Sequence, residues 1–301
     1  MVAWIRLFWM ATAFFLVSGS DVNPRSVQHL LLGRCTEPTS ERFTQLERQF
    51  AHDKMLWGHQ LLTLAKKRQL SPTAKPTSLF VHVISADGTP EKGNVRDAQI
   101  MQQVDALNSG FADTGLSFQL INVSRIVNAD WFNNAGPDTA QQDAMKTSLR
   151  RGGHSDLNIY TVGFTSFTGL LGYATFPQSY QDSPVDDEVV LSFSSLPGGS
   201  LQGYNQGKTG VHETGHWFGL YHTFQGGCLE PGDMVSDTPP EGIPSQDCMP
   251  DRKTCAPDAI EDLSDPINNY MDYSPDSCMT EFSPDQAERA RIQGQFYRGI
   301  Y

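Results

Sequence analysis

The segment HETGHWFGLYH, from His212 to His222, constrains the fold more than any other part of this 301-residue chain. On a helix, His212 and His216 are one turn apart and project from one face, so both imidazoles reach the same ion. Gly219 permits a sharp backbone turn, which ends the helix and brings His222 round as a third ligand. Three nitrogens with an open fourth position are typical of catalytic zinc, whereas structural zinc sites are closed by four protein ligands.

Glu213 is the candidate catalytic residue of this segment. It follows the first histidine, so its carboxylate is expected beside the metal rather than on it. Zinc held by three neutral imidazoles lowers the pKa of its bound water to about 7, and Glu213 would accept the proton as that water attacks a carbonyl. The alternative is a catalytically inactive protein that binds zinc for recognition. A purely structural site does not need this carboxylate, so Glu213 favours a peptidase.

The motif resembles the signature of the metzincin zinc peptidases, which also carry a methionine-containing turn downstream. Here that turn is NNYMDYS, with Met271 lying 49 residues after His222. The surrounding sequence is similar to the pappalysin-type branch, especially its small secreted fungal and bacterial members. The similar segments are GYATFP at 172–177, SLPGG at 195–199, YHTFQGGC at 221–228 and FSPDQAERAR at 282–291, within a resemblance that covers roughly residues 76–301.

This resemblance implies a metzincin-like α+β catalytic domain of two subdomains. A twisted mixed sheet and the active-site helix are expected above a loop-rich, disulfide-bonded lower subdomain that ends in a C-terminal helix, and the cleft is expected between them. Met271 is expected to form a soft hydrophobic floor, since a thioether is a poor ligand for zinc already held by three imidazoles. Tyr273 resembles a tyrosine that hydrogen-bonds the tetrahedral intermediate in several metzincin branches. The alternative for Tyr273 is a packed aromatic beside the metal.

Hydrophobic periodicity and turn residues predict the elements themselves. The last helix is opened by Ser283 as cap and Pro284 as first helical residue. A linker rich in Pro and Thr is expected at 71–77, and no internal repeat is visible. Helices are expected at 40–70, 94–111, 138–151, 204–219 and 283–298, and strands at 79–84, 116–126, 157–162, 172–176 and 188–193.

The chain divides into three parts. Residues 1–20 are expected to be a secretory signal peptide, because Arg6 precedes a mostly apolar run from Leu7 to Val17 and small residues follow. That run is shorter than the roughly 20 residues that span a membrane, so a membrane anchor is not expected. We expect residues 21–75 to be a pro-segment with its linker, and residues 76–301 to be the catalytic domain of a secreted zymogen.

Charge is divided unevenly along the chain. Residues 21–75 carry nine basic and five acidic side chains, whereas residues 76–301 carry twelve and twenty-nine. An acidic catalytic domain argues against nucleic-acid binding and suits metal ions or basic peptides, although solubility of a secreted protein is an alternative explanation. We expect protein or peptide substrates, a monomeric enzyme, and neither a nucleic-acid nor a membrane partner.

Five cysteines are expected to be mostly oxidised in a secreted protein. Cys228, Cys248, Cys255 and Cys278 all follow the zinc motif, and four cysteines allow three pairings that the sequence alone leaves open. The pappalysin-type pattern implies Cys228–Cys255 and Cys248–Cys278. These links would cross-link a Pro-rich region with few aliphatic residues.

The fifth cysteine, Cys35, lies ahead of the linker. A thiolate binds zinc strongly, and the resemblance implies that a leader cysteine can occupy the fourth zinc position and keep the enzyme latent. Cleavage at Lys66-Lys67-Arg68 would then activate the enzyme. The alternative is an unpaired surface thiol.

Calcium is a second expected cofactor. The segment GDMVSDTPP, at 232–240, places oxygen donors on a tight loop just beyond the zinc ligands, which suits Ca²⁺. The resemblance implies calcium in this region, with Asp233, Asp237 and Thr238 as the best matches, and the alternative is an ordinary Asp-rich turn. Separately, Asn122 begins a glycosylation sequon, Asn-Val-Ser, within a predicted strand.

Overall fold

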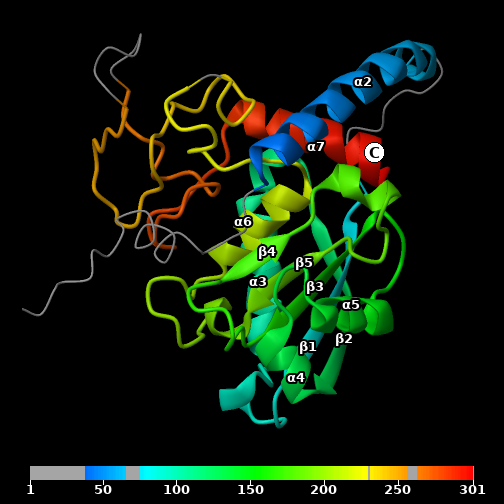
Figure 1. The fold of residues 1–301 in the computed structure, drawn as a ribbon, viewed down its shortest axis with the longest axis vertical. Helices are drawn as coiled ribbons and strands as arrows, with labels where there is room; N and C mark the ends of the chain where they lie inside the picture. Colours follow the sequence, from blue (N-terminus) through cyan, green and yellow to red (C-terminus); the bar gives the residue numbers. More distant parts are fainter. Residues whose placement is uncertain (1–37, 66–74, 230, 256–262, 301) are drawn as a thin grey trace, which may run out of the picture.

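The computed structural model describes residues 38–65, 75–229, 231–255 and 263–300. The expected signal peptide, Cys35 and the expected processing site at 66–68 lie outside these residues. The described part is a central sheet with helices on both faces and a loop-rich region beside it (Figure 1). None of the helices in these ranges is both long and apolar enough to cross a membrane.

Five strands form one mixed sheet in the order β2-β1-β3-β5-β4. Strands β1 and β3 are almost wholly buried, as parallel strands covered on both faces usually are. The edge strand β4 runs antiparallel to β5, whereas the other neighbours pair in parallel. The bounds are β1 (Thr77–Ser85), β2 (Phe118–Val127), β3 (Asp156–Val162), β4 (Gly172–Ala174) and β5 (Val189–Ser192).

Helices cover the two faces of the sheet with separate cores. On one face, α3 (Asp97–Gly110) and the active-site helix α6 (Lys208–Trp217) pack in a cluster that contains Val211 and Ile159. On the other face, α4 (Ala129–Asn134) and α5 (Ala140–Leu149) pack in a cluster that contains Phe132 and Tyr160. The neighbours Ile159 and Tyr160 belong to different cores because successive side chains of a strand point to opposite faces.

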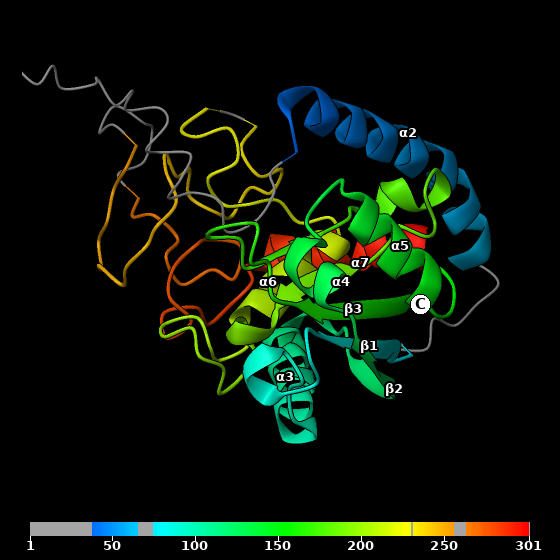
Figure 2. The ribbon, with the colours of Figure 1, turned by 60° about the horizontal axis from the view of Figure 1, so that its bottom comes forward.

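Two further helices lie beside each other at one end of the body. The C-terminal helix α7 (Pro284–Arg298) begins after Ser283, whose hydroxyl accepts from the Gln286 backbone amide at 3.1 Å. Helix α2 (Ser40–Ala65) lies at the outer edge of the body (Figure 2), and its Glu47 and Asp53 side chains contact Arg289 and Tyr297 of α7. The end of the chain is therefore in contact with a segment from its beginning.

In the residues that the structure describes between α6 and α7, the lower subdomain contains little regular structure. Two disulfides cross-link it, Cys228 to Cys255 and Cys248 to Cys278. This is the pairing that the resemblance implies. The mixed sheet, the active-site helix, the cystine-linked loops and the closing helix together confirm the expected two-subdomain α+β fold.

Some expected boundaries are wrong. The active-site helix begins at Lys208 rather than at 204, because Gly207 adopts a left-handed conformation with φ 84° and caps the helix there. The short helix α4 was not expected. Asn128 caps this helix, because its side chain accepts hydrogen bonds from two backbone amides. The described part of the first helix ends at Ala65, so the rest of the expected range to 70 lies outside the described residues.

Candidate active site and metal centre

The three histidines of the motif meet at one point. Their Nε2 atoms form a triangle in which the edges His212–His216, His216–His222 and His212–His222 each measure 3.1 Å. That spacing suits three ligands of one zinc ion with Zn–N bonds of roughly 2.0–2.1 Å. Within the described ranges, this is the one group of three or more histidine, cysteine or acidic side chains placed to hold a metal ion. The donor set therefore fits a zinc site.

Hydrogen bonds and burial keep these imidazoles ready to bind a metal. His212 Nδ1 donates to the Tyr270 carbonyl oxygen at 2.7 Å, and His216 Nδ1 donates to the Leu220 carbonyl oxygen at 2.8 Å. Since a carbonyl can only accept, each Nε2 carries the lone pair. Burial, and then the neighbouring histidines, lower the pKa of His216 and His222 well below its usual value. The neutral imidazole is the form that binds zinc.

Gly219 makes the turn between the helix and the third histidine. Its φ is 83°, and a Cβ at this position would lie 2.3 Å from the Gln293 side chain. The Gly219 carbonyl accepts from Arg289 Nε at 2.9 Å and from Gln293 Nε2 at 3.1 Å. Helix α7 therefore fixes the turn that leads to His222. No sequence signal connected Arg289 or Gln293 to the metal site.

Met271 packs directly beneath the active-site helix. It is fully buried, and a Cβ on Gly215 would lie only 2.5 Å from the Met271 sulfur. The absence of a side chain at Gly215 thus allows the thioether to approach the helix. The Thr223 backbone amide also donates to the Met271 carbonyl at 3.2 Å, which ties the methionine turn to the loop after His222. Sequence reasoning identified Met271 but missed Gly215.

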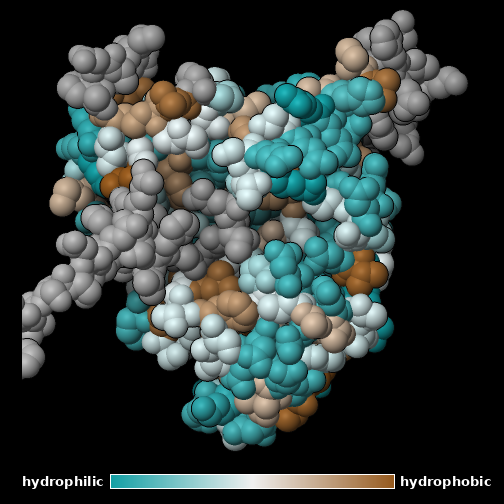
Figure 3. Space-filling view, viewed as in Figure 1, coloured by the Kyte–Doolittle hydropathy of each residue, from teal (hydrophilic) through white to brown (hydrophobic). Residues whose placement is uncertain are grey.

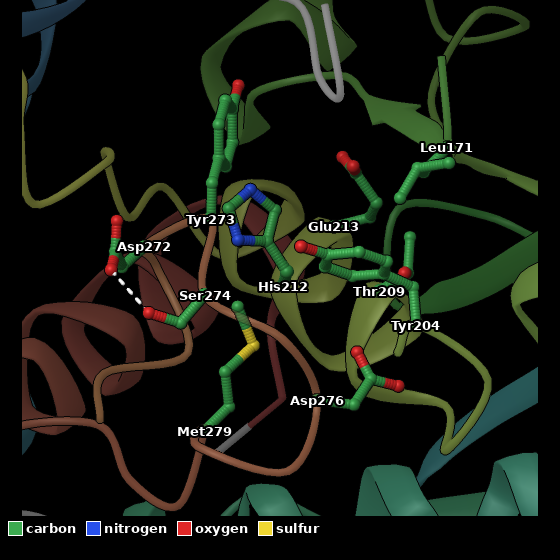
Figure 4. A pocket seen from close by; sticks show the side chains of 10 residues that line it. All are labelled: Leu171, Tyr204, Thr209, His212, Glu213, Asp272, Tyr273, Ser274, Asp276 and Met279. Carbon is green, nitrogen blue, oxygen red and sulfur yellow. Dashed lines mark hydrogen bonds between the residues drawn. The ribbon is translucent and has the colours of Figure 1, made fainter. Parts of the chain in front are cut away.

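Glu213 and His212 line the same cavity. Figure 4 shows the Glu213 carboxylate on one side of the His212 imidazole and the Tyr273 ring on the other. A Cβ on Gly172 would lie 2.8 Å from Glu213 Cγ, so the edge strand β4 passes immediately beside the carboxylate. The remaining lining residues are Leu171, Tyr204, Thr209, Asp272, Ser274, Asp276 and Met279.

Tyr273 is a buried residue against the metal ligands. Its ring centroid lies 5.0 Å from that of His222 and 5.8 Å from that of His212. Phe224 contacts the same ring edge to face, with centroids 4.9 Å apart. The expected packing of an aromatic beside the metal is therefore present, and it fixes where the phenol stands relative to Glu213.

The three expected calcium residues are only partly brought together. The Thr238 hydroxyl lies 2.8 Å from both carboxylate oxygens of Asp233. Burial raises the pKa of Asp233 to about 6. Asp237, in contrast, is exposed at the start of α7, where it accepts from the Ser283 hydroxyl at 2.6 Å and from the Asp285 amide at 2.8 Å.

A buried carboxylate cluster, missed by sequence reasoning, supports the loop after the third histidine. The Thr223 hydroxyl donates to Glu241 Oε2 at 2.7 Å. Arg252 Nη1 contacts both Glu241 at 2.8 Å and Asp265 at 2.7 Å. Burial, and then the nearby Asp272, raise the pKa of Glu241 to about 8. These residues come from separated loops, so no local motif marks them.

Comparison with known proteins points in one direction. Residues 157–293 match the peptidase M43 family model, described as pregnancy-associated plasma protein-A. An extracellular metalloprotease of Pyricularia oryzae is 44% identical over 218 residues, which cover 72% of this chain and 73% of the relative. An extracellular metalloprotease of Podospora anserina is 38% identical over 265 residues, which cover 86% of this chain and 87% of the relative.

Solved structures extend the similarity to the fold. A promirolysin mutant from Tannerella forsythia has a TM-score of 0.64 and 25% identity, and the match covers 88% of this chain and 95% of that chain. Mature mirolysin from the same organism, in complex with a cleaved peptide, has a TM-score of 0.60 and 27% identity. That second match covers 74% of this chain and 96% of the mature enzyme.

Proposed function

This chain belongs to the peptidase M43 (pappalysin) family, and from that premise we propose that Glu213 is the general base of its peptide-bond hydrolysis. The protein is an extracellular zinc metalloprotease whose zinc site consists of His212, His216 and His222. Zinc, when bound, lowers the pKa of a water and polarises the scissile carbonyl. The single observation that carries the proposal for Glu213 is the position of its carboxylate in the cavity beside His212.

Each side chain of the site then has a role. Glu213 accepts a proton from the attacking water and passes it to the leaving amine. Tyr273, across the His212 imidazole, donates a hydrogen bond to the negatively charged oxygen that develops from the carbonyl. The edge strand β4 beside Glu213 offers backbone groups that can align an extended peptide. Met271 holds the floor beneath the helix without contributing a ligand.

A digestion assay tests catalysis against the alternative of an inactive zinc-binding protein. The purified protein is incubated with casein or gelatin, with and without a metal chelator. We expect digestion that the chelator stops and that zinc restores. Intact substrate in the presence of stoichiometric zinc would support the inactive alternative.

We also propose that the chain is made as a zymogen, with a signal peptide at 1–20, a pro-segment and linker at 21–75 and the catalytic domain at 76–301. The match to promirolysin covers 88% of this chain, whereas the match to mature mirolysin covers 74%, which supports a leader ahead of the catalytic domain. Cys35 would bind the zinc and exclude the catalytic water, and cleavage at Lys66-Lys67-Arg68 would release it. A Cys35→Ala protein should then be active before leader cleavage, while wild type stays latent. Equal latency of the two would contradict the switch.

Calcium is proposed as a structural cofactor at Asp233 and Thr238. Their contact, and the burial of the Asp233 carboxylate, leave a hard oxygen site that a cation would stabilise. Asp237 would become a calcium ligand only if its carboxylate gave up its hydrogen bonds to Ser283 and Asp285.

The substrates are proteins, and we propose broad degradation of extracellular proteins by a monomeric enzyme. Cleavage profiling with a peptide library tests this breadth, and a single preferred sequence would contradict it.

Asn122 is exposed on edge strand β2, which makes it accessible for the proposed glycosylation.

A further inference from the structure

The described part of the leader occupies a built site on the catalytic domain. Helix α2 presents Phe43, Leu46 and Phe50 at helical spacing, and Leu46 and Phe50 are buried. Leu46 packs in a small core with Phe176 and Tyr221 of the catalytic domain. The outward face of α2 is hydrophilic over most of its length (Figure 3), up to the exposed Met55 and Leu56. The helix therefore has one face made for this site and one face made for water.

Arg289 of α7 is the centre of the site. Its Nη2 lies 2.5 Å from Glu47 Oε1, and both side chains are largely shielded, with exposures of 8% and 13%. The Tyr221 hydroxyl donates to the same Glu47 oxygen at 2.9 Å. The guanidinium carbon lies 5.3 Å from the Phe50 ring centroid and 5.1 Å from that of Tyr221. A shielded charge pair between two aromatic rings slows dissociation of the partner that supplies the carboxylate.

Two outer hydrogen bonds extend the contact along the helix. The Tyr297 hydroxyl donates to Asp53 Oδ2 at 2.8 Å, and Arg42 Nη2 donates to the Ser179 hydroxyl at 2.8 Å. From Arg42 to Asp53 the helix makes about three turns. These two hydrogen bonds therefore lie on either side of Glu47 along the helix.

We propose that α2 is a noncovalent ligand that stays bound to the catalytic domain after the leader is cut. This inference rests on the proposed cleavage near residues 66–68, which follow α2 in the chain. Because the contacts of α2 do not depend on the cut bond, the removal of the leader requires a second step, the dissociation of the helix. Arg289 also donates to the Gly219 carbonyl, so the helix and the turn before His222 share one side chain. The site around Arg289 therefore binds an amphipathic helix that carries a carboxylate, that of Glu47, between apolar residues.

The test measures release of the leader in a full-length chain. Glu213→Ala prevents self-cleavage, and the recognition sequence of a site-specific protease is inserted between Lys67 and Arg68. Cys35, the cysteine outside both disulfides, is labelled with a fluorescent maleimide, which also stops its thiol from binding zinc. After cutting, the labelled fragment should co-elute with the catalytic domain. When the cut protein is diluted into excess unlabelled peptide of residues 38–56, which blocks rebinding, the fluorescence anisotropy of the label should fall slowly.

Matched variants identify the contact that holds the helix. Glu47→Gln should accelerate release at least about tenfold, because the guanidinium loses its shielded charge partner. Glu41→Gln removes the same charge from an exposed position of the same helix and should release at the wild-type rate. Asp53→Asn, which weakens the outer bond to Tyr297, should accelerate release to a smaller extent.

Two results would overturn the proposal. One is separation of the wild-type fragment from the domain as soon as the chain is cut. The other is equal release rates for Glu41→Gln and Glu47→Gln. Because the assay measures binding in a chain without Glu213, a failure of the proposed catalytic mechanism would leave it unaffected, and the two failures can be told apart.

Discussion

The Arg298 guanidinium carbon lies 3.8 Å from the ring centroid of Trp217, and Arg298 Nη2 donates to the Trp217 carbonyl oxygen at 3.0 Å. Both side chains are fully buried. Asp187, which is also buried, accepts from Arg298 Nη1 at 2.6 Å. The last residue of α7 is thereby locked onto the last residue of the active-site helix by stacking, a hydrogen bond and a desolvated ion pair.

The first prediction concerns this lock. Arg298→Met should lower the free energy of unfolding by about 3 kcal/mol, because the buried Asp187 carboxylate loses its main partner. Urea denaturation of the zinc-loaded protein, in a Glu213→Ala background to prevent self-digestion, measures the change. Arg151→Met, at an exposed arginine, is the control and should change stability by less than about 0.5 kcal/mol. Similar losses in the two variants would argue against the lock.

The second prediction separates metal binding from catalysis. Glu213→Gln should reduce kcat/KM by at least about 10³-fold while bound zinc stays near stoichiometric, because its carboxylate is placed beside the ligands. His222→Ala should lose zinc and activity together. Metal analysis of the purified variants, with exposed Glu288→Gln as a matched control, checks both statements. A Glu213→Gln enzyme that cleaves at the wild-type rate would refute the mechanism.

The third prediction concerns the hydroxyl of Tyr273. Tyr273→Phe keeps the ring that packs on His222 and Phe224 but removes the proposed donor to the developing oxyanion. We expect kcat to fall about 10²-fold with KM nearly unchanged, since the lost bond exists only in the transition state. Steady-state kinetics on a defined peptide measure the split. Tyr180→Phe, at a half-buried tyrosine that does not line the cavity, is the control and should leave kcat unchanged. If Tyr273→Phe also leaves kcat unchanged, Tyr273 is only a packed aromatic.

The fourth prediction is a pH dependence of calcium binding. Burial raises the pKa of Asp233 to about 6, so without a cation this group stabilises the fold at low pH, and the benefit is lost as pH rises through about 6. Calcium needs the ionised carboxylate and should raise the melting temperature at about pH 8 far more than at about pH 5. Thermal unfolding of zinc-loaded protein measures this. Asp233→Asn should abolish the effect, and a calcium shift that persists in this variant would place the ion elsewhere.

The metal centre could be predicted from the sequence because its geometry is local. Three histidines within eleven residues, one helical turn and a glycine suffice to bring three nitrogens together, and the triangle of Nε2 atoms confirms this. The order of strands and helices along the chain could also be predicted, because hydrophobic periodicity is a local pattern of the sequence. Boundaries such as the start of α6 at Lys208 were missed, since the left-handed conformation of Gly207 has no periodic signal.

The surroundings of the metal centre are fixed by tertiary contacts. The sequence left three pairings open for the four cysteines, and the fold joins Cys228 to Cys255 and Cys248 to Cys278. Arg289 contacts Glu47 across 242 positions of sequence and Gly219 across 70. Such contacts depend on how distant elements pack together, and packing leaves no spacing pattern in the chain from which it can be read.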